Sequence, residues 1–284
     1  MSDTLTAPAA ADIDRNPYKA DFPLLAGNPH LAFLDSGATA QRPACVLDAQ
    51  RRFYETMNAN PLRGLYSLSV EATEAIAAVR GQIARLLGAV DERGRACARD
   101  IVFTRNASES LNLVAKSFAP LVLGPGDEVA ITIMEHHSNL IPWQQAAAAA
   151  GAKLVYLYPA PDGTLTADEI AAKIGPRTKI AAVGHVSNVM GVENPVEQIG
   201  RAVHAHGGYL VVDGAQSVPH MAVDVAALGA DFYAFSAHKA LGPMGIGVLW
   251  GRHELLERMP PMLTGGEMID SVTESGAVWA PVPE

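Results

Sequence analysis

Short apolar runs alternate along this chain with segments, many of them alanine-rich, that have helical periodicity. Such runs, bounded by polar clusters, are typical of buried strands. The strands are predicted at residues 101–104, 129–134, 153–157, 180–186, 209–212, 232–235 and 246–250. The alternation predicts an α/β fold with a mostly parallel seven-stranded sheet flanked by helices.

Helix signals occur before and between these runs. Residues 142–150 form an alanine-rich helical segment that opens with a proline. Thr166 and Glu169 form a capping box that predicts a helix extending toward Ile174. An amphipathic helix is expected after Ser69, because apolar residues recur there with a period of 3.6. These residues are Ile76, Val79, Ile83, Leu86 and Leu87.

Polar side chains directly follow five of the predicted strands. The C-terminal ends of parallel strands meet at one edge of a sheet, where α/β proteins bind ligands. The five segments are 105–108 (RNAS), 135–139 (EHHSN), 187–188 (SN), 213–216 (DGAQ) and 236–239 (SAHK). A polar cofactor site needs this mixture of carboxylate, imidazole, amide, hydroxyl and amine groups. Each segment alone has an ordinary explanation, such as a helix cap or a surface lysine, but five independent coincidences would then be required.

Among these polar residues, Lys239 gives the most specific indication of a chemical role. It lies between a predicted strand and the glycine-rich turn 241–247, where glycines permit close backbone approach. The spacing matches neither a dinucleotide fingerprint nor a P-loop. A lysine held at a buried edge can have a lowered pKa and act as a Schiff-base nucleophile.

Charge and composition limit the partners. The chain has 21 Lys and Arg against 30 Asp and Glu, a net charge of −9, and no basic run, so nucleic acid is not expected as a partner. Its apolar stretches are shorter than the ~20 residues of a membrane-spanning helix. The N-terminus lacks the basic start and apolar core of a signal peptide. We therefore expect a cytoplasmic protein without a membrane segment.

No metal site is expected. Cys45 and Cys97 are the only cysteines and lack C-x-x-C spacing, which suits a reducing compartment and excludes a zinc–cysteine site. His204 and His206 are two residues apart in a predicted helix, so their side chains point in different directions. They are therefore not expected to complete a metal site with the pair at 136–137.

Four segments, in this order, resemble class-V aminotransferase-like PLP-dependent enzymes, and specifically the Suf-type branch of cysteine desulfurases. They are residues 134–139 (MEHHSN), 185–191 (HVSNVMG), 212–216 (VDGAQ) and 236–247 (SAHKALGPMGIG). The resemblance extends from about Asp21 to the last residue. It implies the large domain of the fold type I PLP-dependent transferases at 21–284, with an N-terminal extension, preceded by a flexible segment at 1–20.

The resemblance also implies roles for individual residues around pyridoxal 5'-phosphate (PLP). Lys239 would form the Schiff base, and Asp213 would keep the pyridine nitrogen protonated, which makes the ring an electron sink. His136 would stack on the ring and, with Lys239, serve catalysis. Gln216 would bond the phenolic oxygen, and Asn188 would lie near that oxygen and the substrate carboxylate.

The same resemblance implies a phosphate site at the start of a helix. The phosphate would rest on Ala107 and Ser108, where free N–H groups and the helix dipole favour an anion. Ser236 and His238 would add further donors.

By the same resemblance, the protein would be a cysteine desulfurase that converts L-cysteine to L-alanine and an enzyme persulfide. Iron–sulfur cluster assembly, a sulfur-acceptor protein of the Suf system and a homodimer are implied with it. In the family the nucleophilic cysteine lies on a loop of a C-terminal small domain, and neither Cys45 nor Cys97 matches that loop. The expectation is therefore a fragment that lacks the small domain.

Two other interpretations stay open. A selenocysteine lyase or another class-V enzyme would use the same fold and cofactor site, because a fold does not fix the reaction. A catalytically inactive, truncated PLP-binding module is the alternative outside the enzymes, because the expected nucleophile is not in this chain.

Overall fold

The computed structural model describes residues 16–62, 64–266 and 268–283. Its centre is a seven-stranded sheet with the order β1-β7-β6-β5-β4-β2-β3. The strands are β1 (Ile101–Thr104), β2 (Glu128–Thr132), β3 (Lys153–Leu157), β4 (Thr178–Gly184), β5 (Tyr209–Asp213), β6 (Phe232–Ser236) and β7 (Gly247–Gly251). Strands β2 to β6 are parallel, and β7 is antiparallel to both β6 and β1. The predicted fold class is confirmed. Most of the expected flexible segment 1–20 lies outside the described residues.

All seven predicted strands are present, but two of them end earlier than the apolar pattern suggested. Strand β2 ends at Thr132 instead of Met134, and Thr132 Oγ1 accepts a hydrogen bond from the Met134 N–H at 3.1 Å. Strand β4 ends at Gly184 instead of Val186. The apolar residues beyond both ends belong to loops, where Met134 and Val186 help to line a cavity.

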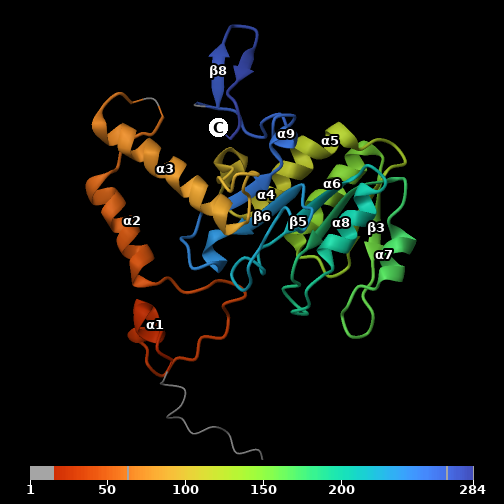
Figure 1. Cartoon of the computed structure of the whole chain (residues 1–284), viewed down its shortest axis with the longest axis horizontal. Coiled ribbons are helices and arrows are strands. Elements are labelled where there is room, and N and C mark those ends of the chain that lie inside the picture. Colours follow the sequence, from red (N-terminus) through yellow and green to blue (C-terminus); the bar gives the residue numbers. More distant parts are fainter. Residues whose placement is uncertain (1–15, 63, 267, 284) are drawn as a thin grey trace, which may run out of the picture.

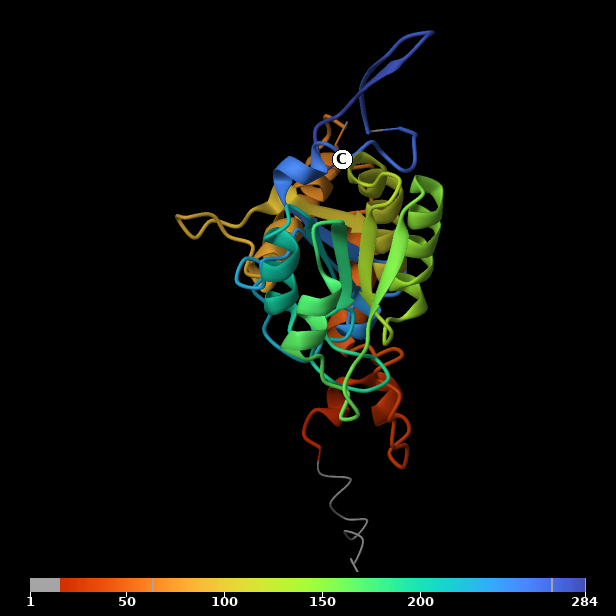
Figure 2. The ribbon, with the colours of Figure 1, turned by 90° about the vertical axis from the view of Figure 1, so that its right-hand side faces the viewer.

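Helices cover both faces of the sheet, as Figure 2 shows from the side. One face carries α4 (Ala107–Leu113), a π-helical stretch (Val114–Phe118), α5 (Ala119–Val122), α6 (Ile141–Ala150) and α9 (His253–Leu256). The other carries α7 (Ala167–Lys173), α8 (Val196–His204) and the end of α3 (Ser67–Leu86). Alternate strand residues enter the two cores: in β5, Leu210 and Val212 face one cluster and Val211 the other. Burial on both faces explains the continuous apolar runs in the sequence.

The predicted capping box of α7 is half formed. Thr166 Oγ1 accepts a hydrogen bond from the Glu169 N–H at 3.2 Å, as predicted. Glu169 does not return to Thr166, because its Oε1 accepts from the Tyr158 N–H at 2.9 Å. The glutamate thus ties α7 to the segment after β3.

Two further helix boundaries differ from the prediction. Helix α3 begins before Ser69, which is buried in the first turn and donates through its hydroxyl to the Asn60 carbonyl oxygen. Helix α8 ends at His204, so His206 lies outside the helix that was expected to hold both. No group of three His, Cys, Asp or Glu side chains among the described residues is arranged to hold a metal.

The N-terminal helices and a C-terminal hairpin extend from this body. Figure 1 shows α1 (Pro23–Ala26), α2 (Ala44–Thr56) and the first turns of α3 to one side of the sheet. Neither α1 nor α2 contains a buried residue. The hairpin of β8 (Ile269–Val272) and β9 (Ala277–Trp279) was not predicted. Within the described residues, no helix has the length and apolarity to cross a membrane.

Candidate active site

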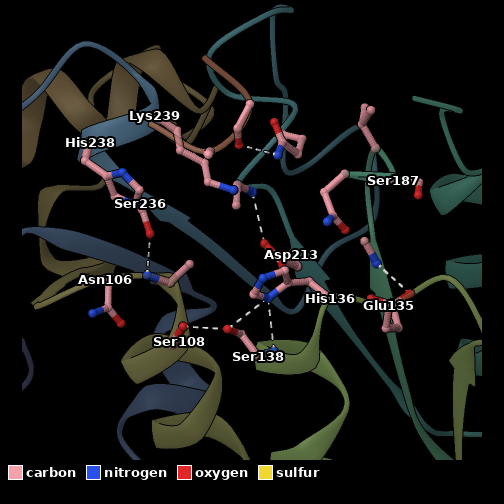
Figure 3. Close-up of a pocket in the computed structure, with 18 of the residues that line it drawn as sticks. Asn106, Ser108, Glu135, His136, Ser138, Ser187, Asp213, Ser236, His238 and Lys239 are labelled. Carbon is pink, nitrogen blue, oxygen red and sulfur yellow. Dashed lines mark hydrogen bonds between the residues drawn. The ribbon is translucent and has the colours of Figure 1, made fainter. Parts of the chain in front are cut away.

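A cavity of about 590 Å³ lies at the C-terminal edge of the parallel strands (Figure 3). Five strand ends contribute to it, those of β1, β2, β4, β5 and β6. All nine site residues expected from the sequence line it: Ala107, Ser108, His136, Asn188, Asp213, Gln216, Ser236, His238 and Lys239. The structure therefore brings these residues together, while their individual roles remain predictions.

Asp213 is the buried acid of the cavity. It is the last residue of β5 and is 8% exposed. Its Oδ1 accepts from the Ala215 N–H at 3.0 Å, the one hydrogen bond of this side chain within the described part of the chain. Burial raises the pKa of Asp213, and the charges of Lys239 and His136 oppose that rise. The carboxylate can therefore take a further cationic or N–H partner.

Lys239 extends toward Asp213 in Figure 3. It ends a single 3-10 turn (Ala237–Lys239) that directly follows β6. Burial lowers the pKa of the Lys239 amine, and the Asp213 charge acts against this change. A lowered pKa increases the share of neutral amine, which is the nucleophilic form.

The glycine-rich turn after Lys239 lets β7 approach the start of α4. A Cβ atom placed on Gly247 would lie 2.4 Å from the backbone of Asn106. Asn106 is the N-cap of α4, and its Oδ1 accepts from the Glu109 N–H at 2.9 Å. Gly247 thus allows the lysine segment and the helix start to face the same cavity.

The start of α4 departs from one expectation. The Ala107 N–H is not free, because it donates to Ser236 Oγ at 2.8 Å. The Ser236 hydroxyl accepts this bond and so keeps its own hydrogen for donation. Ser108 contributes its hydroxyl, whose oxygen lies 2.6 Å from Ser138 Oγ. This end of the cavity presents hydroxyl donors at a helix N-terminus, an environment that favours an anion.

His136 stands at the turn between β2 and α6. Its Nδ1 accepts from the Ser138 N–H at 3.1 Å and lies 3.0 Å from Ser138 Oγ. Since Ser138 also contacts Ser108, the imidazole is coupled to the start of α4. The ring of His136 lies beside Asp213 in Figure 3.

The N-terminal segment contributes to the site, which sequence reasoning missed. Gln216 Nε2 donates to the Gly37 carbonyl oxygen at 2.8 Å, and His238 Nδ1 lies 3.1 Å from Thr39 Oγ1. Burial and the charges of Lys239 and Arg42 lower the pKa of His238. No local pattern in residues 34–39 indicated this contact.

Glu135 is a second acidic residue of the cavity wall. Its membership of the polar cluster after β2 was a signal in the sequence, but no role was assigned to it. Its carboxylate accepts bonds from Thr132, Asn139 and Gly184. Burial, with a further contribution from Asp213, raises the pKa of Glu135 to about 7, although the hydrogen bonds oppose this rise.

Neither cysteine lines the cavity. Cys45 is exposed on α2. Cys97 precedes a short 3-10 turn (Ala98–Asp100), and burial together with Asp100 raises the pKa of its thiol. A raised pKa reduces the thiolate fraction, so Cys97 is poorly suited to nucleophilic attack.

The profile of the class-V aminotransferase family matches residues 32–284. The chain belongs to this family. Enzymes of the family depend on PLP. The cavity of this class-V domain contains a lysine with a lowered pKa and a buried carboxylate that can accept a hydrogen bond from a ring N–H. It also has hydroxyl donors at the start of a helix. This donor set fits PLP.

The curated relatives of this class-V domain include cysteine desulfurases. It is 47% identical over 257 residues to a probable cysteine desulfurase of Halalkalibacterium halodurans, covering 90% of this chain and 62% of that protein. It is 46% identical over 270 residues to a cysteine desulfurase of Klebsiella pneumoniae, covering 93% and 65%. The chain thus spans slightly less than two thirds of the length of these relatives.

Solved structures of cysteine desulfurases also superpose on this chain. The apo structure of a cysteine desulfurase from Thermococcus onnurineus superposes with a TM-score of 0.86 at 37% identity, covering 99% of this chain and 66% of that one. The Escherichia coli cysteine desulfurase CsdA superposes with a TM-score of 0.84 at 39% identity, covering 94% and 65%. The mostly parallel sheet and its helical layers are therefore those of the cysteine desulfurase structures.

Proposed function

We propose that this chain carries the cofactor site of a PLP-dependent cysteine desulfurase of the Suf-type branch, which converts L-cysteine to L-alanine and a persulfide. The observation that carries this proposal is the pair of Lys239 and Asp213 in one cavity. The lysine has a lowered pKa, and the acid has room for another partner. The high identity to cysteine desulfurases supports L-cysteine as the substrate.

The cavity residues would divide the binding of PLP among them. Lys239 would hold it covalently through its amine, and Asp213 would hold a proton at the ring nitrogen. His136 would cover one ring face of PLP. Gln216 would donate a hydrogen bond to the phenolic oxygen, and Asn188 would lie near that oxygen. Ala107, Ser108, Ser236 and His238 surround the place proposed for the phosphate, with the Ser236 hydroxyl hydrogen available for it.

When bound, PLP supplies an electron sink for negative charge at the substrate Cα. Once the substrate is bound, the freed amine of Lys239 would be placed to accept the Cα proton and to donate protons to the carbon atoms that become alanine. Asp213 sustains the electron sink because a carboxylate in a site of low polarity strongly favours a protonated ring nitrogen.

The thiolate that receives the sulfur is assigned to neither Cys45 nor Cys97, since neither lines the cavity. Transfer onward to a Suf-system acceptor protein, for iron–sulfur cluster assembly, follows from the same proposal. Both cysteines are free, which suits the reducing cytoplasm.

A homodimer is part of the proposal. Large apolar side chains are exposed on and beside the projecting α2–α3 region shown in Figure 1. They include Phe53, Tyr54, Leu65, Tyr66 and Val70, with Leu65 fully exposed. Exposed apolar groups gathered in this way are typical of a protein interface.

The test begins with PLP binding. The purified 284-residue chain should develop the absorption band of lysine-bound PLP and become labelled on borohydride reduction. Lys239→Ala should abolish both, whereas Lys153→Ala, at an exposed lysine of β3, should change neither. Labelling that persists in Lys239→Ala would contradict the assignment.

The substrate is tested next. The loaded chain should exchange the Cα hydrogen of L-cysteine with deuterium from solvent, a reaction that needs no acceptor thiolate. Faster processing of L-selenocysteine than of L-cysteine would favour the lyase alternative. Bound PLP without any Cα exchange would identify an inactive binding module.

A further inference from the structure

Within the part of the chain that the structure describes, the Glu135 carboxylate accepts three hydrogen bonds at the cavity wall, while the Asp213 carboxylate accepts one. Oε1 accepts from the Thr132 hydroxyl at 2.6 Å and from the Gly184 N–H at 3.0 Å. Oε2 accepts from Asn139 Nδ2 at 2.6 Å. The donors belong to β2, β4 and the turn that precedes α6. One carboxylate therefore joins three elements, and none of its donors is charged.

A hydrogen bond between Trp143 and Asn139 fixes the orientation of the Asn139 amide, and with it the direction of the bond to Glu135. The Asn139 amide oxygen accepts from Trp143 Nε1 at 2.8 Å, and both side chains are fully buried. This bond orients the Asn139 amide so that its NH₂ group faces Glu135. A glutamine at this position would oppose an NH₂ group to an NH₂ group, so an acceptor-only group is required.

Both backbone polar groups of Gly184 are hydrogen-bonded to side chains. Glu135 accepts from its N–H, and Asn194 Nδ2 donates to its carbonyl oxygen at 2.7 Å. Gly184 is the last residue of β4, and the segment that follows it leads to Asn188. A change at Glu135 would therefore move two strand ends that face the cavity.

His136 directly follows Glu135 in the chain. On its far side, Ser138 bonds to His136 and to Ser108 of α4. The imidazole is thus held between two anchors, the Glu135 network toward β4 and the serine pair toward α4. Figure 3 shows both anchors on the wall of the same cavity.

We propose that Glu135 is a positioning residue that fixes the ring plane of His136, and its separation from Asn188, through its bonds to Thr132, Asn139 and Gly184. This inference rests on the proposed function, because the ring to be positioned is stacked on PLP. The hydrogen-bond geometry supports it, because only a side chain that accepts at both oxygens satisfies the Thr132, Asn139 and Gly184 donors together.

The experiment exchanges the two partners of one hydrogen bond. Glu135→Gln creates the NH₂-to-NH₂ contact, and Asn139→Asp alone opposes two carboxyl groups. The double variant Glu135→Gln/Asn139→Asp restores every bond with one direction reversed, since the carboxylate introduced at position 139 can still accept from Trp143. Glu169→Gln is the matched control, because Glu169 accepts one backbone N–H outside the cavity.

Two measurements are made on chain loaded with PLP. The dissociation constant of PLP should rise about tenfold in Glu135→Gln, the equivalent of about 1.4 kcal/mol. The circular dichroism induced in the PLP band, per bound PLP, should fall by at least half, because it reports how firmly the ring is oriented. Both values should return to within about twofold of wild type in the double variant and stay unchanged in Glu169→Gln.

The outcomes separate the two claims. Wild-type chain that shows no PLP band contradicts the proposed function. Wild-type chain with the band, but with affinity and dichroism indifferent to Glu135→Gln, overturns only the positioning role. A folded double variant that stays as poor as the single variant also overturns it. If Glu135→Gln does not fold, Thr132→Val removes one donor instead, and unchanged dichroism in that variant overturns the proposal.

Discussion

Two buried aspartates lie at opposite edges of the same sheet and have opposite surroundings. Asp231 precedes β6 and is 2% exposed. Its Oδ2 accepts from the Leu210 N–H at 2.7 Å and contacts His204 Nε2 at 2.8 Å, while Oδ1 lies 3.4 Å from Arg252 Nη1. Asp213, at the C-terminal edge, has a single side-chain hydrogen bond among the described residues, to the Ala215 N–H.

The difference indicates that Asp231 stabilises the fold, whereas Asp213 is available to bind a ligand. Every oxygen of Asp231 has a partner from a neighbouring element, so its burial is compensated within the protein. Asp213 is buried without that compensation, which raises its pKa. Incomplete satisfaction of a buried group inside a cavity is typical of functional sites.

The largest effect is expected for Asp213→Asn. This change keeps the shape of the side chain and removes the charge that would hold a proton on the cofactor ring. In chain loaded with PLP, Cα hydrogen exchange of L-cysteine should slow by about 1,000-fold, which corresponds to about 4 kcal/mol of activation free energy. Exchange rates followed by NMR in deuterated water measure this, and a loss of less than tenfold would refute the role of Asp213.

Asp231→Asn should mainly reduce stability. Removing one partner from a buried charged network costs about 3–5 kcal/mol, and solvent access to Arg252 and His204 places the expectation near the lower end. Urea unfolding of the apo chain measures it, with apo Asp213→Asn as the control, which should lose less than about 1 kcal/mol. Equal losses at the two positions would abolish the contrast between these acids.

The pH dependence of stability extends the comparison to a third acid, Glu135, whose pKa is also raised by burial. Its folded pKa of about 7 lies above the ordinary value of 4.5. Its contribution to stability is complete below pH 4.5 and is lost as the pH rises through 7. The lowered pKa values of His185 and His238 act in the opposite sense at mildly acidic pH, so the range above their ordinary value of 6.5 is informative.

Between pH 6.5 and 8.5, the free energy of unfolding of the apo chain should therefore fall in wild type relative to Glu135→Gln. The expected difference is a little under ~1 kcal/mol. Urea titrations of both proteins at the two pH values measure it. Parallel curves would show that Glu135 is already ionised at the lower pH.

The smallest effect is expected at the cysteines. Cys45→Ser and Cys97→Ser should each leave PLP affinity and Cα exchange within about twofold of wild type, because neither side chain lines the cavity. Alanine formation from L-cysteine should likewise be insensitive to both. A loss of alanine formation confined to one of these variants would identify that cysteine as the sulfur acceptor.

The sheet was predictable because its strands are buried on both faces and therefore stand out as apolar runs. The hairpin β8–β9 was not, since most of its side chains are exposed and no face of it enters the core. The ends of β2 and β4 were placed two residues late, because Met134 and Val186 are apolar but lie in loops that line the cavity, where Met134 also packs against the core. Apolarity alone does not distinguish a core position from a cavity wall.

The sequence by itself determined which strand-end side chains meet, because parallel strands deliver the residues that follow them to one edge. Only the tertiary structure decided how those side chains are paired. The bonds between Ala107 and Ser236, Glu135 and Gly184, and Gln216 and Gly37 join residues 129, 49 and 179 positions apart. No local pattern encodes such contacts, and the pKa shifts depend on them and on burial. Asp213 ends one buried strand and Asp231 precedes another. The difference between their surroundings is therefore a property of the assembled sheet.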